Sequence, residues 1–167
     1  MQSITTDSRV TFESSLTAAE FGKDREKFLG DLTQKMGEST ELPTIEEIER
    51  VWYEIMREMK ATGEVSRFTA TVINVDGTQT ECDVVRVGVY NAVCGNSYLE
   101  YVPTKGQYQF LARQPAGRYT SSAGRVSNAD ASSGYVSFSV DPSGPSGLSL
   151  IHISEPTRQA EISYAVF

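Results

Sequence analysis

The sequence holds little of the chemistry on which most enzymes depend. Its 167 residues include one histidine (His152), one tryptophan and two cysteines, and no glycine-rich phosphate loop, HExxH, CxxC or GxSxG pattern occurs. Such patterns place metal ligands, nucleophiles or phosphate-binding amides at defined spacings, so their absence removes the common sequence signatures of catalytic and metal sites. We therefore expect a protein that is not an enzyme and that has no catalytic residue, no metal site and no cofactor.

Positive charge and long apolar runs are scarce as well. Lysine and arginine together number 15 against 22 aspartates and glutamates, which gives a net charge of -7. Because non-specific nucleic-acid binding depends on a basic surface, we expect no nucleic-acid partner. No stretch approaches the roughly 20 apolar residues of a membrane-spanning helix, and the N-terminal MQSITTDSRV lacks a signal-peptide pattern. We expect contact with a membrane only through segments outside this chain.

The two cysteines, Cys82 and Cys94, are twelve residues apart in a stretch that alternates like one long strand. On a single strand, at about 3.3 Å per residue, their Cα atoms would lie about 40 Å apart, far beyond the ~7 Å limit for a disulfide. We therefore expect no disulfide. Without a second cysteine pair, a zinc site is not expected either. The two cysteines therefore do not indicate whether the protein lies in an oxidising or a reducing compartment.

The first part of the chain follows helical periodicity. Residues 8–20 and 24–36 each carry an apolar stripe, and Gly22 separates the two stripes. Gly37 closes the second stripe, and the turn-forming GESTELP follows. These residues predict two helices.

A longer helix follows the turn. Thr44 precedes Glu47 by three residues, which is the capping-box pattern that begins a helix, and Gly63 is suited to end it. Packing in the core is our default interpretation of the apolar face of this helix, while a coiled-coil seam or a partner-binding face stays open. The apolar residues recur at spacings of three and four: Ile45, Ile48, Trp52, Ile55 and Met59.

After Gly63 the pattern changes to β-branched alternation. RFTATVINV and TQTECDVVRVGVYNAV flank an Asp-Gly turn and predict two strands of a hairpin. CGNS and PTKG mark further turns before QYQFLA, and GYVSFSV alternates as a last strand. The Gly- and Ser-rich residues 113–134 are expected to be largely loop, in which a short strand or helix stays open.

These patterns predict the α+β fold class. We expect an N-terminal helical arm of two to three helices over residues 1–62, with coiled-coil potential. A small antiparallel β-sandwich or open barrel over residues 64–147 is expected to follow.

The final stretch, LSLIHISEPTRQAEISYAVF (residues 148–167), reads as translated DNA. Back-translation of LSLIHI gives CTG TCT CTT ATA CAC ATC, which matches a transposon end used in library preparation. SEPTR and EISYAVF match the adapter sequence that follows it in the same frame. We interpret residues 148–167 as a non-native tail derived from a sequencing adapter, and His152 then leaves the list of functional candidates.

Six stretches resemble one known family: SLTAAEFGKDREKFL, LPTIEEIERVWYEIMREMKATGEVSRF, VVRVGVYNAV, YLEYVPTKGQ, LARQPAGRYT and VSFSVDPSGP. Over residues 14–145 the chain resembles the periplasmic N-terminal region of MotA/TolQ/ExbB-type proton-channel proteins of TonB systems. The combination of VVRVGVYNAV with ARQPAGRY is the most specific part of the resemblance. It implies a longer gene product with a signal peptide, a coiled-coil stretch and proton-conducting membrane helices, so this chain is expected to be a fragment without the channel residues.

The resemblance implies a non-catalytic periplasmic interaction domain, attached to the inner membrane in the intact protein, that helps TonB-dependent transport use the proton gradient. Its expected partners are ExbB-, ExbD- and TonB-like inner-membrane proteins, with self-association through the helical arm. An alternative is a small-ligand or glycan-binding β domain of an envelope protein, which would need an aromatic groove among Tyr98, Tyr101 and Tyr108. The candidate partner-binding residues are Trp52, Tyr53 and Met56 on the long helix and Arg113, Pro115, Arg118 and Tyr119 in the loop.

Overall fold

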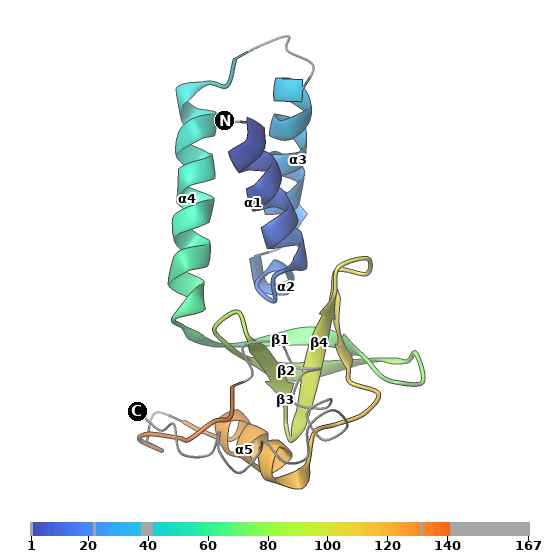
Figure 1. Ribbon diagram of the computed structural model, residues 1–167. Helices are drawn as coiled ribbons and strands as arrows, with labels where there is room; N and C mark the ends of the chain where they lie inside the picture. Colours follow the sequence, from blue (N-terminus) through green and yellow to red (C-terminus); the bar gives the residue numbers. More distant parts are fainter. Residues whose placement is uncertain (1, 22, 38–41, 131, 141–167) are drawn as a thin grey trace, which may run out of the picture.

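The computed structural model describes residues 2–21, 23–37, 42–130 and 132–140. Figure 1 shows a helical arm that stands on a small β-barrel, with one further helix on the opposite side of the barrel. The arm consists of α1 (Gln2–Ser14), α2 (Ala18–Phe21), α3 (Lys23–Gly37) and α4 (Ile45–Thr62). The tail at residues 148–167 lies outside the described residues.

The predicted start of α4 is confirmed. Thr44 Oγ1 accepts a hydrogen bond from the Glu47 N–H at 3.2 Å, and the Glu47 carboxylate accepts one from the Thr44 N–H at 2.7 Å. This second bond, with a further one from Lys35, holds the pKa of Glu47 below its usual value. The helix ends at Thr62, as Gly63 predicted, and the Gly63 N–H donates back to the Lys60 carbonyl.

The first predicted helix is divided into two. α1 ends at Ser14 and α2 begins at Ala18, so Leu16 and Thr17 lie in a turn between them. The turn points toward the rest of the molecule: the Leu16 carbonyl accepts a hydrogen bond from the Tyr108 hydroxyl at 2.6 Å. Because the break serves a contact with a residue far along the chain, local periodicity could not predict it.

Five strands form a closed barrel. They are β1 (Val65–Ile73), β2 (Gln79–Val87), β3 (Asn91–Cys94), β4 (Ser97–Val102) and β5 (Gln107–Phe110), each antiparallel to the next. In such a meander the fifth strand runs in the same direction as the first, so the closing β1–β5 pairing is parallel and covers only two residue pairs. The predicted α+β class, an arm followed by a small barrel, is confirmed, but the barrel is closed and not open, and its β1–β5 pairing is parallel.

The predicted hairpin at Asp76-Gly77 joins β1 and β2. The stretch TQTECDVVRVGVYNAV, which was expected to form one strand, is divided into β2 and β3. Gly88 interrupts it with a φ of +58°, a value that favours glycine. A Cβ at Gly88 would lie 2.5 Å from the Thr62 carbonyl oxygen, at the end of α4. The chain therefore turns back here.

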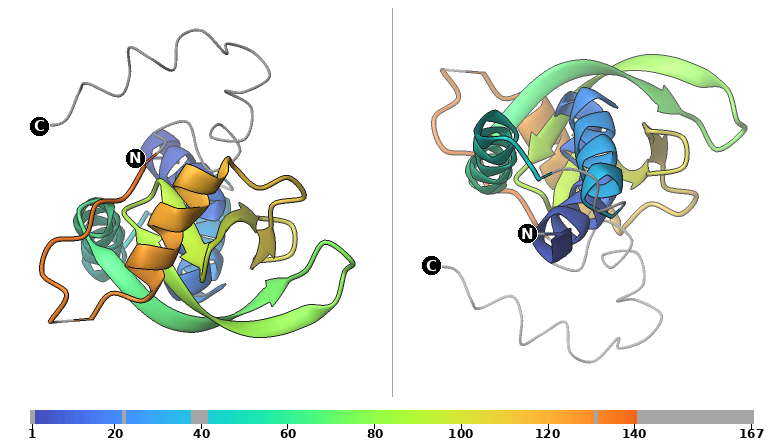
Figure 2. Two further views of the ribbon diagram at one scale, coloured as in Figure 1. Left: turned by 90° about the horizontal axis from the view of Figure 1, so that it is seen from below. Right: turned by 90° about the horizontal axis from the view of Figure 1, so that it is seen from above.

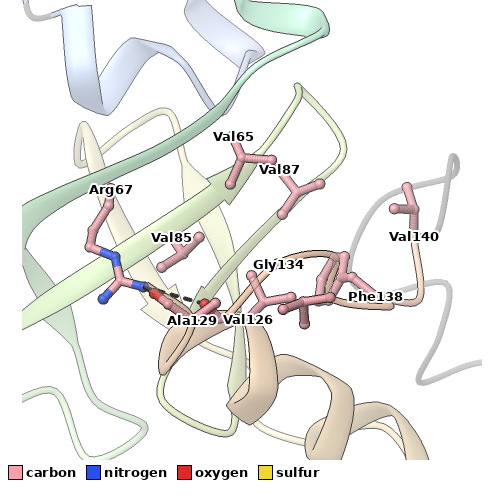
Figure 3. Close-up of a pocket in the computed structure, with 10 residues that line it drawn as sticks. Val65, Arg67, Val85, Val87, Val126, Ala129, Gly134, Phe138 and Val140 are labelled. Atoms are coloured by element: carbon pink, nitrogen blue, oxygen red, sulfur yellow. Dashed lines mark hydrogen bonds between the residues drawn. The ribbon is translucent and has the colours of Figure 1, made fainter. Parts of the chain in front are cut away.

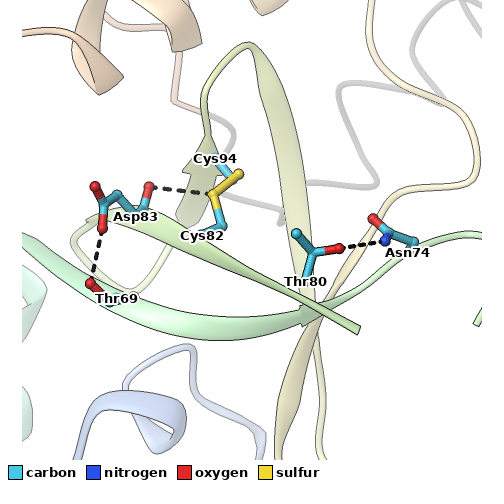
Figure 4. Close-up of a disulfide and its surroundings, with 6 residues drawn as sticks. All are labelled: Thr69, Asn74, Thr80, Cys82, Asp83 and Cys94. Carbon is cyan, nitrogen blue, oxygen red and sulfur yellow. Dashed lines mark hydrogen bonds between the residues drawn. A yellow bond between two sulfur atoms is a disulfide. The ribbon is translucent and has the colours of Figure 1, made fainter. Parts of the chain in front are cut away.

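This turn overturns the expectation for the cysteines. Cys82 on β2 and Cys94 at the end of β3 lie on neighbouring antiparallel strands, with Cα atoms 6.3 Å apart, and they form a disulfide (Figure 4). The expectation of no disulfide is wrong because it assumed a single extended strand.

Buried residues lie on both faces of the sheet, because neighbouring residues of a strand, such as Val84 and Val85, point to opposite sides. In Figure 1 the arm lies above the barrel and α5 (Gly117–Ser127) lies below it. The cluster on the arm side contains Leu16, Val72, Val84, Ala92, Leu99 and Tyr108. The cluster on the α5 side contains Val85, Val93, Tyr98, Leu111, Ala123 and Val126.

The stretch GYVSFSV is extended but pairs with no strand, so the predicted last strand is wrong. The barrel closes through β5 instead, and this stretch packs on the sheet by side chains: the Phe138 and Tyr98 rings stack with centroids 5.8 Å apart. The Tyr98 hydroxyl also donates to the Ser139 carbonyl at 3.2 Å. Among the described helices, none combines the length and the apolar composition needed to cross a bilayer.

Candidate functional site

The long helix α4 turns its charged side toward the rest of the arm. Lys35 on α3 contacts both Glu47 carboxylate oxygens at 3.1 Å. The Arg57 guanidinium lies 3.8 Å from the centre of the Phe21 ring, an ordinary cation–π distance. A helix that packs against other helices usually turns its apolar side toward them. In α4 these inward contacts are instead made by charged side chains.

A buried ionic cluster fixes the lower end of α4. The Arg25 side chain is 1% exposed and donates to Glu58 Oε2 at 2.8 Å, and its second nitrogen donates to the Phe12 carbonyl and to Thr17 Oγ1. Ser15 and Thr17 donate to the two Glu58 oxygens. A buried charge is tolerated when it is paired and hydrogen-bonded in this way. The cluster determines which side of α4 faces inward.

The apolar side of α4 consequently faces outward. Trp52 is 65% exposed and Tyr53 61%, and Met56 is exposed beside them. Packing in the core, our default interpretation of this stripe, is wrong; the two alternatives that stayed open both need an exposed face. Exposed apolar residues in one contiguous group are typical of an interaction surface. We call this surface the α4 apolar face; it comprises Ile45, Ile48, Trp52, Tyr53, Met56 and Met59.

The four candidates in the loop divide into two kinds. Pro115 is buried, and Tyr119 is half-buried against the cluster on the α5 side of the sheet, so both have a packing role. Arg113 and Arg118 are exposed; the Arg118 guanidinium donates to the Tyr119 hydroxyl at 2.8 Å. These residues lie at the start of α5, whereas α4 belongs to the arm on the other side of the sheet (Figure 1). The two predicted groups are therefore not brought together.

The tyrosines of the alternative binding groove belong to the core. Tyr98 and Tyr108 are fully buried, and Tyr101 is half-buried with its ring against Tyr108. Burial raises the pKa of the Tyr108 hydroxyl, which is also bonded to the Leu16 carbonyl. These three side chains form no aromatic groove.

A groove that the sequence did not reveal lies beside α5 (Figure 3). It has a volume of about 520 Å³ and is walled by apolar side chains of β1, β2, α5 and the extended stretch, with Arg67 at its edge. The Arg67 guanidinium donates to the Ala129 carbonyl at 2.8 Å and to the Val126 carbonyl at 3.3 Å. Val65 and Arg67 line the groove together because they lie two positions apart on β1, but no local pattern could reveal the groove itself, since residues 134–140 form part of its wall.

A second buried arginine joins the arm to the barrel. Arg86 on β2 is fully buried and contacts the Glu20 carboxylate on α2 through Nε at 2.8 Å and Nη2 at 2.7 Å. Its Nη1 donates to the carbonyls of Ala61 and Gly88. One side chain therefore connects α2, the end of α4 and the β2–β3 turn. Sequence reasoning missed this residue, because nothing in VVRVG marks its arginine as buried.

In the part of the chain that the structure describes, no group of three or more histidine, cysteine, aspartate or glutamate side chains is placed to hold a metal ion. The strongest candidate site is instead a surface, the α4 apolar face. No family model matches the sequence, and comparisons with curated proteins and with solved structures give no match either.

Proposed function

We propose that this chain is a non-catalytic periplasmic interaction domain of an ExbB-like inner-membrane component, which helps TonB-dependent transport use the proton gradient. The family assignment comes from the sequence resemblance over residues 14–145. The structural observation that carries the proposal is the α4 apolar face, which offers Trp52, Tyr53 and Met56 to solvent. Aromatic residues and methionine are enriched where proteins meet.

The disulfide supports the periplasmic part of the proposal. Disulfides persist in oxidising compartments such as the bacterial periplasm and are rare in the cytosol. The Cys82–Cys94 bond joins two adjacent strands of the barrel, where it reinforces a β2–β3 pairing of only four residue pairs. A domain that relies on this bond would be suited to the periplasm.

The firm connection between the arm and the barrel also supports the proposed function. Arg86 and the hydrogen bond from Tyr108 to Leu16 fasten the lower end of the arm to the sheet. A contact made on α4 would therefore orient the whole domain, which suits a part that positions one envelope protein relative to another.

The groove beside α5 favours a second candidate function, a small-ligand-binding β domain. Its walls are mostly valine, with Phe138 beside them, and Arg67 is the one charged residue among those that line it. Such a groove fits an apolar ligand with an acidic group, and it differs from the tyrosine groove that a glycan would need.

Recovery of partners from cells tests the proposed function. Cross-linking followed by purification of the intact protein is expected to recover ExbB-, ExbD- or TonB-like proteins. The double variant W52A/M56A is expected to reduce that recovery at least tenfold, because it removes Trp52, the largest side chain of the face, together with the exposed Met56 beside it.

The matched control is V75A, which shortens an equally exposed apolar side chain in the turn between β1 and β2. It should leave recovery unchanged. Saturable binding of a fatty acid to the purified domain, together with no recovered partner, would contradict the proposed function and favour the second candidate.

A further inference from the structure

Strand β1 has one edge that no other strand covers over most of its length. Its pairing with β2 runs without a break from Val65 to Ile73, whereas its pairing with β5 includes only Val72 and Ile73. Among the described residues, the edge at residues 65–70 therefore has no neighbouring strand, and we call it the β1 edge. Seen along the arm, the long ribbons of β1 and β2 curve along one outer side of the molecule (Figure 2).

The hydrogen-bonding pattern shows which main-chain groups lie on the β1 edge. In an antiparallel pair alternate residues bond across to the partner strand, and the residues between them point the other way. The Asn74 N–H donates to the Thr78 carbonyl at 2.8 Å, so in this register the even-numbered residues of β1 bond to β2. The N–H and C=O groups that point to the open edge are those of Val65, Arg67 and Thr69.

The β1 edge lies beside the apolar groove next to α5. Val65 and Arg67 face the same side of the sheet as Val87 and Val85, their partners on β2, and all four line the groove (Figure 3). A strand added to β1 would direct every second side chain to that side. The groove would therefore receive alternate side chains of the added strand.

Arg67 determines the charge that suits the middle of this edge. Its Nη2 donates to the carbonyls of Val126 and Ala129, which turns the side chain toward α5. Its Nε and Nη1 make no hydrogen bond to any part of the chain that the structure describes, so both can donate to a carboxylate. An acidic side chain with apolar side chains two positions before and after it is complementary to the β1 edge.

The sheet has a second open edge, on β2, which is protected by charge. β3 pairs only with residues 84–87 of β2, so residues 79–83 are uncovered on that side. The exposed Glu81 and Asp83 belong to this segment, and exposed charges are a usual protection of edge strands against pairing. Residues 65–70 contain neither proline nor lysine, and their pairing with β2 has no bulge. The β1 edge is thus the one suited to receive a strand.

We propose that the β1 edge binds an extended segment of a partner protein, which adds to the barrel as a strand antiparallel to β1. The main-chain groups on the edge fit a strand, and the groove with Arg67 fits the alternation of apolar and acidic side chains. A second copy of this chain fits less well, because the register that pairs residues 65, 67 and 69 would set two Arg67 side chains opposite each other. The inference goes beyond the proposed function and does not depend on it.

A blocked synthetic peptide, acetyl-Thr-Val-Thr-Glu-Thr-Val-Thr-amide, tests the inference on the full chain. We expect saturable binding at peptide concentrations up to about 1 mM. Hydrogen exchange measured by NMR should slow about tenfold or more at the N–H groups of Val65, Arg67 and Thr69. The N–H groups of Ser66 and Phe68 are the internal control, because they already bond to β2 and should change little.

Matched changes in the peptide test its register and its charge. Methylation of the glutamate nitrogen, which would face β1, should weaken binding about tenfold, because it removes one main-chain hydrogen bond. Methylation of the threonine nitrogen that follows it is the control and should have little effect, since that nitrogen would face away from β1. Lysine in place of the glutamate should weaken binding at least about threefold, because it would lie beside Arg67.

Matched proline variants test the edge on the protein. T69P removes an N–H that points to the β1 edge but leaves the bonds to β2 in place, and it should weaken peptide binding about tenfold. E81P makes the same change on the open edge of β2 and should bind the peptide normally.

Three results would overturn the inference. The first is no peptide binding at about 1 mM, and the second is equal binding by T69P and the unaltered chain. The third is slowed exchange at Val65, Arg67 and Thr69 when the chain is concentrated without peptide, because a second copy would then be the occupant of the β1 edge.

Discussion

Replacing Arg86 by methionine is expected to lower the free energy of unfolding by about 3–5 kcal/mol, the usual cost of removing one partner of a buried ion pair. The variant removes the charged partner of the Glu20 carboxylate, which keeps only its hydrogen bond from Ser66, and it deprives the carbonyls of Ala61 and Gly88 of their donor. Methionine fills most of the volume, so the loss reports on polar groups and not on a cavity.

Urea denaturation followed by circular dichroism measures this effect. R118M is the matched control, because the exposed Arg118 makes its contacts with the neighbouring Tyr119 and its loss should change stability by less than about 0.5 kcal/mol. Equal stability of R86M and R118M would show that Arg86 does not join the arm to the barrel.

Loss of the Cys82–Cys94 disulfide is expected to lower stability by about 2–3 kcal/mol, because the bond closes a short loop and restricts the unfolded chain. The bond connects positions 12 residues apart. The double variant C82A/C94A should show the loss, and so should the unaltered chain in a thiol reductant.

The reductant itself supplies the control for this prediction. It should leave C82A/C94A unchanged, since that variant has no bond to break. If the reductant does not shift the denaturation of the unaltered chain, the two cysteines are not joined in solution, and the support for an oxidising compartment is lost.

Features that depend on near neighbours in the chain could be predicted from the sequence. The capping box of Thr44 and Glu47 involves residues three positions apart, and the hairpin at Asp76-Gly77 depends on one turn that favours positive φ. The order of an arm followed by a barrel also follows from a change of periodicity after Gly63.

The orientation of α4 could not be predicted in this way. Periodicity identifies an apolar face, but the rule that such a face points inward assumes that the neighbouring helices are apolar. Here α1 and α3 present charged and aromatic partners, and the pairing of Arg25 with Glu58 spans 33 positions in sequence. No local sequence pattern predicts a contact between residues so far apart in the chain.

The helix α5 could not be predicted from its amino-acid composition. GRYTSSAGRVS looks like a loop because glycine and serine dominate it. Its small residues instead allow the helix to approach the β3–β4 turn closely: a Cβ on Gly124 would overlap the side-chain oxygen of Asn96. Small side chains at a close contact and small side chains in a loop give the same sequence signal.

Trp52 offers the most direct test of the central claim, that the α4 apolar face is a contact surface. As the only tryptophan, it reports on that face alone in a fluorescence-quenching experiment with acrylamide. We expect strong quenching in the isolated chain and marked protection when the chain is bound to its partners. Equal quenching of Trp52 in the isolated and the partner-bound chain would contradict that claim.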